Sequence, residues 1–273
     1  MIKRITVGIL ALVVVLYIAG MGVMYFKQRD FEYDAPGKIT ALADTALNDA
    51  QTVTIPTTDG QTINGWYAAP RGGKPVILFY KGNSGSFSFE HARYEKWTGD
   101  GYGFLAFDYR GFPASPGTIS QQHILDDALA AFDWLKAKDA RIVVWGRSLG
   151  ASPATYVATQ RNVDALLLET PFDSAVSVAN DSYWFFPVGL LMMDQFPSDQ
   201  WIGKVKAPVF VAHGTDDKTI PLPHGEKLYS LVSNKHGMWV EPGGTHTNLW
   251  DRGIWNRAKA FFEDTEKKVV AAQ

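Results

Sequence analysis

The sequence predicts an α/β fold with a sheet of about eight mainly parallel strands flanked by helices. Short apolar runs alternate with stretches of helical periodicity along most of the 273 residues. This alternation is typical of parallel strands joined by crossover helices. Asp59-Gly60 favours a tight hairpin turn, so the first two strands are expected to pair in antiparallel fashion. A chain of this length is commonly a single domain of this kind.

The first element is a long apolar segment. From Ile5 to Phe26 there is no charged residue, and about 22 residues at a rise of ~1.5 Å cover the ~30 Å hydrocarbon core of a bilayer. A cleaved signal peptide has a shorter apolar region and a small-x-small exit, an alternative for which Ala19-Gly20 leaves some room. We predict an uncleaved signal-anchor, a transmembrane helix within residues 1–28, and a linker over residues 29–50.

Basic residues flank the apolar segment on both sides. Lys3 and Arg4 precede it, and Lys27 and Arg29 follow it among several acidic residues. Positive charge is retained preferentially in the cytoplasm. The slight bias here predicts that the rest of the chain lies outside the cytoplasm.

The strands and helices after the linker are expected in alternating order. The strands are Val53–Ile55, Ile63–Ala68, Val76–Tyr80, Phe104–Phe107, Ile142–Trp145, Ala165–Leu168, Val209–Ala212 and Met238–Val240. The helices are Phe87–Trp97, Ile119–Lys138, Leu149–Thr159, Leu222–Val232 and Leu249–Glu263.

The run Gly146-Arg147-Ser148-Leu149-Gly150 lies between a predicted strand and a predicted helix. In this context, G-x-S-x-G forms a sharp turn that exposes a serine hydroxyl above the end of a sheet. Small residues two positions before and after the serine leave space for the strained turn. A glycine-containing turn without catalytic function is the alternative. We predict that Ser148 is a nucleophile.

A serine nucleophile requires a base and an orienting acid, and this architecture supplies them in the order Ser, Asp or Glu, His. His246 lies on a glycine-rich loop after the last predicted strand, and Asp217 follows the end of the preceding strand. Asp216 and Glu169 also lie near strand ends and remain alternatives for the acid. The position of its loop favours Asp217, so the predicted catalytic residues are Ser148, Asp217 and His246.

The other histidines have structural explanations. His213 closes a strand and is expected to brace the acid loop by hydrogen bonding, whereas His91 and His123 lie in helical patterns and His224 and His236 in polar contexts. No histidine pair has metal-ligand spacing with a carboxylate on one helix face. We therefore predict no metal site.

Acyl transfer also requires donors for the developing oxyanion. One donor is the backbone N–H after the nucleophile, here that of Leu149, and the second comes from the loop after the third strand. That loop is Lys81-Gly82-Asn83-Ser84-Gly85-Ser86, which lacks the spacing of a phosphate-binding loop. We predict that the backbone of Asn83 supplies the second donor.

In combination, these motifs resemble the α/β-hydrolase superfamily, and more narrowly its single-pass membrane-anchored serine hydrolases. The matching segments are Lys81 to Gly85, Asp108 to Phe112, Gly146 to Gly150, Glu169 to Phe172, and His213 to Asp217 with Ile220-Pro221. The resemblance runs from about Thr52 to Phe262, and implies an α/β-hydrolase catalytic domain over residues 51–273. In the family pattern H-G-x-x-D, the fifth position carries the acid, which favours Asp217. Lys81 stands where the family usually has histidine, and a cation there would favour an anionic substrate.

Residues 174–203 are a possible cap after the sixth strand. The run from Tyr183 to Phe196 is rich in aromatic residues, leucine and methionine, and methionine suits adaptable apolar pockets. A helix packed on the body is the equally weighted alternative. In the cap interpretation, these side chains line an acyl pocket and favour medium or long acyl esters over acetate. The candidate substrate-binding residues are Lys81, Tyr183, Trp184, Phe185, Leu190 and Met193.

Composition narrows the possible functions. The chain has no cysteine, which excludes disulfides and metal thiolates, and its formal net charge is −2 without a basic cluster, so a nucleic-acid partner is not expected. We predict a cofactor-independent serine hydrolase of esters or thioesters, with a small-molecule acyl substrate and a membrane partner. A membrane-tethered peptidase or amidase and a non-catalytic lipid-binding protein are the alternatives. The oligomeric state is left open.

Overall fold

The computed structural model describes residues 2–138 and 140–271. Its strands form one sheet of eight in the order β1-β2-β4-β3-β5-β6-β7-β8. β2 pairs antiparallel with β1 and β4, and all other neighbours are parallel, which confirms the predicted fold class. The strands are β1 (Gln51–Pro56), β2 (Thr62–Ala68), β3 (Val76–Tyr80), β4 (Gly103–Phe107), β5 (Ile142–Arg147), β6 (Ala165–Glu169), β7 (Val209–Gly214) and β8 (Lys235–Glu241).

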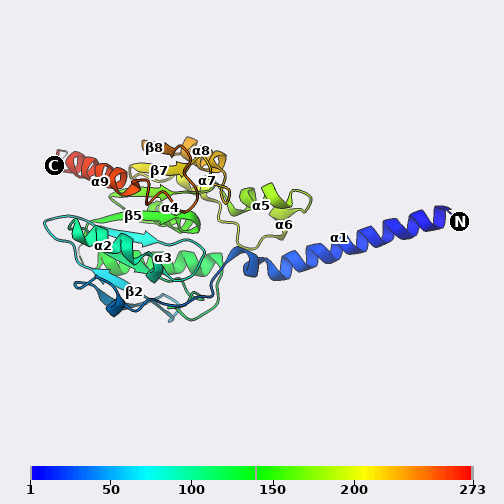
Figure 1. Ribbon diagram of the computed structural model, residues 1–273, viewed down its shortest axis with the longest axis horizontal. Helices are drawn as coiled ribbons and strands as arrows, with labels where there is room; N and C mark the ends of the chain where they lie inside the picture. The colour runs from blue at the N-terminus through cyan, green and yellow to red at the C-terminus, as the bar shows by residue number, and fades with distance from the viewer. Residues whose placement is uncertain (1, 139, 272–273) are drawn as a thin grey trace.

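Helices cover both faces of the sheet (Figure 1). One core layer contains buried residues of α3, α4, α7 and α8, and the other contains buried residues of α2 and α9. Alternate side chains of β3 enter opposite layers, Leu78 in the first and Phe79 in the second, as the two-residue period of a strand requires. The helices are α1 (Ile2–Glu32), α2 (His91–Gly99), α3 (Gln121–Lys136), α4 (Ala151–Gln160), α5 (Ala175–Tyr183), α6 (Val188–Leu191), α7 (Ser198–Ile202), α8 (Leu222–Ser230) and α9 (Ile254–Ala271).

Three of the five predicted helices match the structure to within two residues at each end, and the other two differ by more. The last helix begins at Ile254 instead of Leu249, because Gly253 has a φ of 91°, a conformation that an α-helix does not contain. The helix predicted from Phe87 begins as a 3-10 helix and becomes α2 only at His91. The Asp59-Gly60 hairpin is confirmed, since β1 and β2 pair across it and Gly60 has a φ of 80°.

The first helix extends away from the body of the molecule, and α5 and α6 lie near its base (Figure 1). It is long and apolar enough to cross a membrane by length and composition. The helix continues to Glu32, past the predicted boundary at residue 28. This continuation brings Gln28, Arg29 and Glu32 against the body, where each forms contacts described below.

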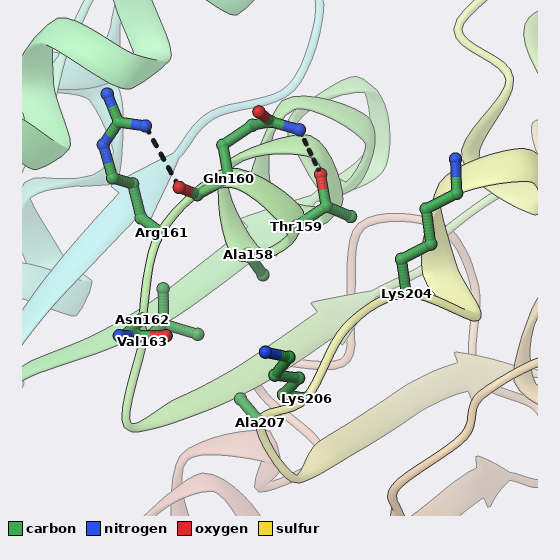
Figure 2. A pocket seen from close by; sticks show the side chains of 9 residues that line it. All are labelled: Ala158, Thr159, Gln160, Arg161, Asn162, Val163, Lys204, Lys206 and Ala207. Atoms are coloured by element: carbon green, nitrogen blue, oxygen red, sulfur yellow. Dashed lines mark hydrogen bonds between the residues drawn. The ribbon is translucent and has the colours of Figure 1, made fainter.

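A cavity of about 370 Å³ lies away from the strand ends that carry the candidate catalytic residues. It is formed by the loops that precede β6 and β7, and its lining includes Arg161, Lys204 and Lys206 (Figure 2). None of the predicted site residues lines it. The candidate site therefore lies at the opposite, carboxyl-terminal edge of the sheet.

Candidate active site

Ser148 lies on the sharp turn between β5 and α4. Its φ is 54°, a strained conformation for a residue other than glycine. A Cβ at Gly146 would lie 2.5 Å from the carbonyl oxygen of Gly150, and a Cβ at Gly150 would lie 2.0 Å from that of Tyr80. Only glycine fits at both positions without backbone movement, so these two residues permit the turn that presents Ser148.

The structure brings Ser148, His246 and Asp217 into one hydrogen-bonded chain. The Nε2 atom of His246 lies 2.8 Å from Ser148 Oγ, and its Nδ1 atom lies 2.8 Å from Asp217 Oδ2. Ser148 and Asp217 are buried, and His246 is half-buried. Loops after β5, β7 and β8 supply the three residues, as the order of the motifs predicts. With Nδ1 protonated, the imidazole would accept the serine proton at Nε2.

The structure distinguishes the three candidate acids by their partners. Glu169 is buried in a bidentate ion pair with Arg93, at 2.8 and 2.9 Å, and also accepts a hydrogen bond from the indole of Trp145. Asp216 is exposed and accepts a hydrogen bond from the Thr215 hydroxyl. Of the three, only Asp217 contacts His246 in the described structure.

Asp217 is held in the ionised form by its donors. Burial favours the protonated acid, but hydrogen bonds from His213 and His246 outweigh it, so the pKa of the Asp217 carboxyl lies below its ordinary value. His213 is fully buried, and its Nε2 donates to the carbonyl oxygen of Ile220 at 2.9 Å and lies 3.4 Å from Asp217. This is the bracing position that the sequence predicts for His213.

The loop after β3 lies beside the serine. A Cβ at Gly82 would lie 3.4 Å from the Cβ of Ser148, so the loop backbone approaches the candidate nucleophile closely. Asn83, the predicted oxyanion donor, is held by the segment after α1. Its carbonyl oxygen accepts from the backbone N–H of Asp34, and its side-chain amide donates to the carbonyl oxygen of Glu32 at 3.0 Å. Leu149, the other predicted donor, is buried directly after Ser148.

Lys81 points its charge into the protein. The ammonium lies 3.6 Å from the centre of the Phe112 ring and donates to the carbonyl oxygen of Gly82. Burial lowers the pKa of this ammonium from its usual 10.5 to about 8. Lys81 is only 2% exposed, yet it is among the residues that line the polar cavity beside Ser148.

Two cavities meet at Ser148, and both are also lined by Asn83. The polar cavity, of about 420 Å³, is bordered by charged and hydroxyl side chains, including Glu90, Arg147 and Thr247. The apolar cavity has a volume of about 260 Å³. Its main lining residues are Met24, Phe31, Phe172, Val178, Tyr183, Val188 and Met192. A bound molecule with one polar and one apolar part would place both parts beside Ser148.

The predicted cap residues divide into two groups. Tyr183 lines the apolar cavity, but Trp184, Phe185, Leu190 and Met193 are exposed and do not. Trp184 and Phe185 lie in the turn after α5, whereas Leu190 lies in α6. Val188 and Met192, at the two ends of α6, line the cavity instead. Within the predicted cap, α7 packs on α4 through Tyr156 and Trp201. For α7, this agrees with the alternative that the segment is a helix packed on the body.

The remaining histidines have partners that do not include Ser148. His224 lies between Asp173, at 2.7 Å, and Asp181 of α5, at 3.0 Å, and these hydrogen bonds raise its pKa. His91 contacts Glu95, and His123 contacts the Thr118 carbonyl oxygen. His236 forms a long contact with Asp264.

Sequence reasoning missed the contributions of α1 and of Arg147. Met24, Gln28 and Glu32 line the apolar cavity, although they belong to the predicted anchor and linker. Their spacing of four residues places them on one helix face, and this pattern in the sequence could have predicted that they act together. Arg147 borders the polar cavity and forms an ion pair with Glu90 at 2.8 Å. It lies within the G-x-S-x-G motif itself.

The chain is similar to several known proteins. Residues 68–201 match the X-Pro dipeptidyl-peptidase (S15) family. An uncharacterised protein of Mycobacterium tuberculosis, Rv2307c, is 33% identical over 94% of this chain and 95% of its own length. The lysophosphatidylserine lipase ABHD12 of Rattus norvegicus is 32% identical over 62% of this chain and 48% of its own length. The esterase Pf2001 of Pyrococcus furiosus has the same fold, with a TM-score of 0.65 at 19% identity over 85% of this chain and 97% of that one.

Proposed function

Because this chain belongs to the α/β-hydrolase superfamily, we propose that it is a serine hydrolase that cleaves carboxylic esters or thioesters. One observation carries the proposal: Ser148, His246 and Asp217 form a hydrogen-bonded chain with both distances at 2.8 Å. Ester hydrolysis by a serine nucleophile needs a hydroxyl whose proton has an acceptor at this distance. The superfamily membership supports hydrolysis in general, and the geometry supports the serine mechanism.

The reaction proceeds through an acyl-enzyme. His246 accepts the Ser148 proton while Oγ bonds to the carbonyl carbon, and Asp217 stabilises the imidazolium. The N–H groups of Asn83 and Leu149 bind the oxyanion, and each such donor contributes about 3 kcal/mol to the transition state. His246 then protonates the leaving oxygen or sulfur as the bond to the acyl carbon breaks. A water molecule then attacks the acyl-enzyme while His246 again acts as base, and the carboxylic acid is released from Ser148.

The two cavities favour a substrate with one acyl chain and a polar head. The apolar cavity suits the chain, and the polar cavity suits a head that binds Arg147 or neighbouring polar groups. The lipase named among the relatives acts on such a molecule, a lysophospholipid. We expect medium or long acyl esters to be better substrates than acetate.

A peptidase or amidase is the second candidate, and the match to the S15 peptidase family favours it. An apolar cavity beside the serine suits an acyl chain better than a peptide, whose backbone groups require polar partners. Matched ester and amide substrates with the same acyl group separate these candidates. A higher kcat/KM on the amide would replace the esterase proposal.

The first helix supports a membrane location. We propose that α1 anchors the enzyme as a single span, with the catalytic domain outside the cytoplasm. Its apolar composition and 31-residue length support the span. The small excess of positive charge before the span supports the orientation.

The decisive test is hydrolysis of p-nitrophenyl esters of increasing chain length by the full-length protein in detergent. We expect Ser148→Ala to lower kcat by at least about 10³-fold and to abolish labelling by a fluorophosphonate. Ser230→Ala, at an exposed position outside the site, serves as the control and should retain both. Activity and labelling that persist in folded Ser148→Ala would refute the proposal.

A further inference from the structure

The cap segment, defined as residues 175–193 with α5 and α6, packs directly on α1. The Tyr17 and Phe186 rings lie 5.3 Å apart, and a Cβ at Gly20 would lie 3.2 Å from the Phe186 ring. Tyr17, Gly20, Met24 and Gln28 are spaced by three or four residues and therefore share one face of α1. The cap segment thus contacts α1 along the apolar run and not merely at its charged end.

Polar side chains of α1 satisfy backbone groups of the cap segment. The Tyr17 hydroxyl donates to the carbonyl oxygen of Phe185 at 2.7 Å, and Gln28 donates to that of Leu191 at 3.1 Å. The side-chain oxygen of Gln28 accepts from the backbone N–H of Met193 at 2.6 Å. Irregular backbone is tolerated at membrane depth only where neighbouring protein groups satisfy it. These bonds meet that requirement for the turn and the end of α6.

The outer surface of the cap segment is apolar. Between Asp181 and Asp194 no residue carries a charge, and Trp184 and Leu190 are 79% and 86% exposed. Phe185 and Met193 are exposed as well. A contiguous surface of large apolar side chains is unfavourable in water and marks a protein or membrane contact.

The length of α1 decides whether the cap segment lies in water or in the bilayer. The contact at Tyr17 lies roughly 15 Å along the helix from Lys27. If the cap segment lay in water, the adjacent half of α1 would lie there too. About 12 uncharged residues, from Ile5 to Leu16, would then remain to cross a hydrocarbon core of ~30 Å, which needs about 20. A bilayer span therefore requires the cap segment at membrane depth.

Two cavities with shared lining residues lie along the contact between α1 and the cap segment. The apolar cavity beside Ser148 is lined by Met24 and Gln28 of α1 and by Val188 and Met192 of the cap segment. A smaller cavity, of about 30 Å³, is lined by the same four residues together with Leu191 and Phe186. The two cavities follow the seam between α1 and α6 toward Gly20, which lies within the apolar run.

We propose that the cap segment is embedded in the membrane beside α1, and that acyl chains reach Ser148 from the bilayer between α1 and α6. The partner of this surface is the lipid bilayer itself. The access route rests on the hydrolase function proposed above, whereas the location of the cap segment does not. The two parts are therefore tested by different measurements.

The location is tested with a nitroxide spin label on the full chain in phosphatidylcholine vesicles. The chain contains no cysteine, so Leu190→Cys provides a unique attachment site, and Glu226→Cys on the exposed surface of α8 provides the matched control. We expect a water-soluble nickel chelate to collide with the label at residue 190 at least tenfold less often than at residue 226, and oxygen to reach it readily. Equal access of the chelate to both labels would overturn the proposal.

The access route is tested by narrowing the seam. Met24→Trp should lower the ratio of kcat/KM on a dodecanoyl ester to kcat/KM on an acetyl ester at least tenfold in vesicles. Val23→Trp, on an exposed face of the same helix, should keep the wild-type ratio. An unchanged ratio in Met24→Trp would overturn the route. If the wild type showed no turnover that depends on Ser148, the hydrolase function would be refuted. The spin-label result would still decide the location of the cap segment.

Discussion

The two oxygens of the Asp217 carboxylate have separate tasks. Oδ1 accepts the backbone N–H groups of Thr219 and Ile220 at 2.9 and 2.8 Å, and Oδ2 faces His246 at 2.8 Å. The backbone donors fix the carboxylate plane, so Oδ2 is aimed at the imidazole before substrate binds. An amide at this position would keep its oxygen on the two backbone donors and direct its NH₂ group at His246. Nδ1 of the imidazole can accept from that group only in the tautomer that lacks a proton there.

Asp217→Asn should therefore lower kcat by about 10³- to 10⁴-fold, because the imidazole would be held in the wrong tautomer. The measurement is steady-state hydrolysis of the best p-nitrophenyl ester, with circular dichroism to verify the fold. Asp216→Asn is the matched control, since Asp216 is exposed and its carboxylate accepts a hydrogen bond from the Thr215 hydroxyl without contacting His246 in the described structure. We expect its kcat within about twofold of wild type. Similar losses in both variants would exclude Asp217 as the specific orienting acid.

Lys81 is a buried base whose charge is costly to the folded state. Its pKa of about 8 in the folded protein lies below the 10.5 of an exposed lysine. Below pH 8, both folded and unfolded chains carry the charge. Between about pH 8 and 10.5, the unfolded chain binds more protons, so the free energy of unfolding rises with pH.

Comparison of the wild type with Lys81→Met isolates this contribution. Between pH 7 and 10.5, the wild type should gain stability relative to the variant on the order of 3 kcal/mol. Denaturant unfolding of both proteins across this range measures the difference. A difference that is independent of pH would show that Lys81 titrates alike in the folded and unfolded chains.

The strands and their connecting helices were predictable because each buries a regular apolar pattern. All eight strands lie where the apolar runs indicate, and the nucleophile turn follows from two glycines whose side-chain positions are occupied by backbone. The order of the motifs along the chain also predicted which loops meet at Ser148. These features depend on local pattern and topology, which a single sequence contains.

The cap and its lining were not predictable in the same way. Trp184 and Leu190 have the composition of a pocket lining, yet both are exposed, one in the turn after α5 and the other in α6. The lining residues Met24 and Glu32 come from a helix that hydropathy assigns to the membrane. The α1 contribution arises from tertiary contact between segments more than 140 residues apart. The four-residue spacing of Met24 and Glu32 indicates a shared helix face, but the sequence does not show which segment packs on that face.

Asp194 joins α1, the end of the cap segment and the body of the molecule. Its carboxylate is 4% exposed and accepts hydrogen bonds from Arg29 at the end of α1, from the Tyr33 hydroxyl, and from the backbone N–H of Gln121 at the start of α3. Asp34, directly after Tyr33, pairs with the loop that carries Asn83. The end of α1 is therefore part of the scaffold around the candidate active site.

The ion pair between Arg29 and Asp194 should consequently contribute to the stability of the whole molecule. Arg29→Met leaves a buried carboxylate with fewer donors, and we expect a loss of about 2 kcal/mol in the free energy of unfolding in detergent. Lys27→Met is the matched control, because Lys27 and Asp30 are more than 60% exposed and exposed pairs contribute little. If only the covalent backbone connected α1 to the body, without stabilising side-chain contacts, both variants would unfold at the same denaturant concentration. A selective loss in Arg29→Met would show that the anchor and the catalytic domain fold as one unit, because the carboxylate that binds the anchor also caps α3 within the core.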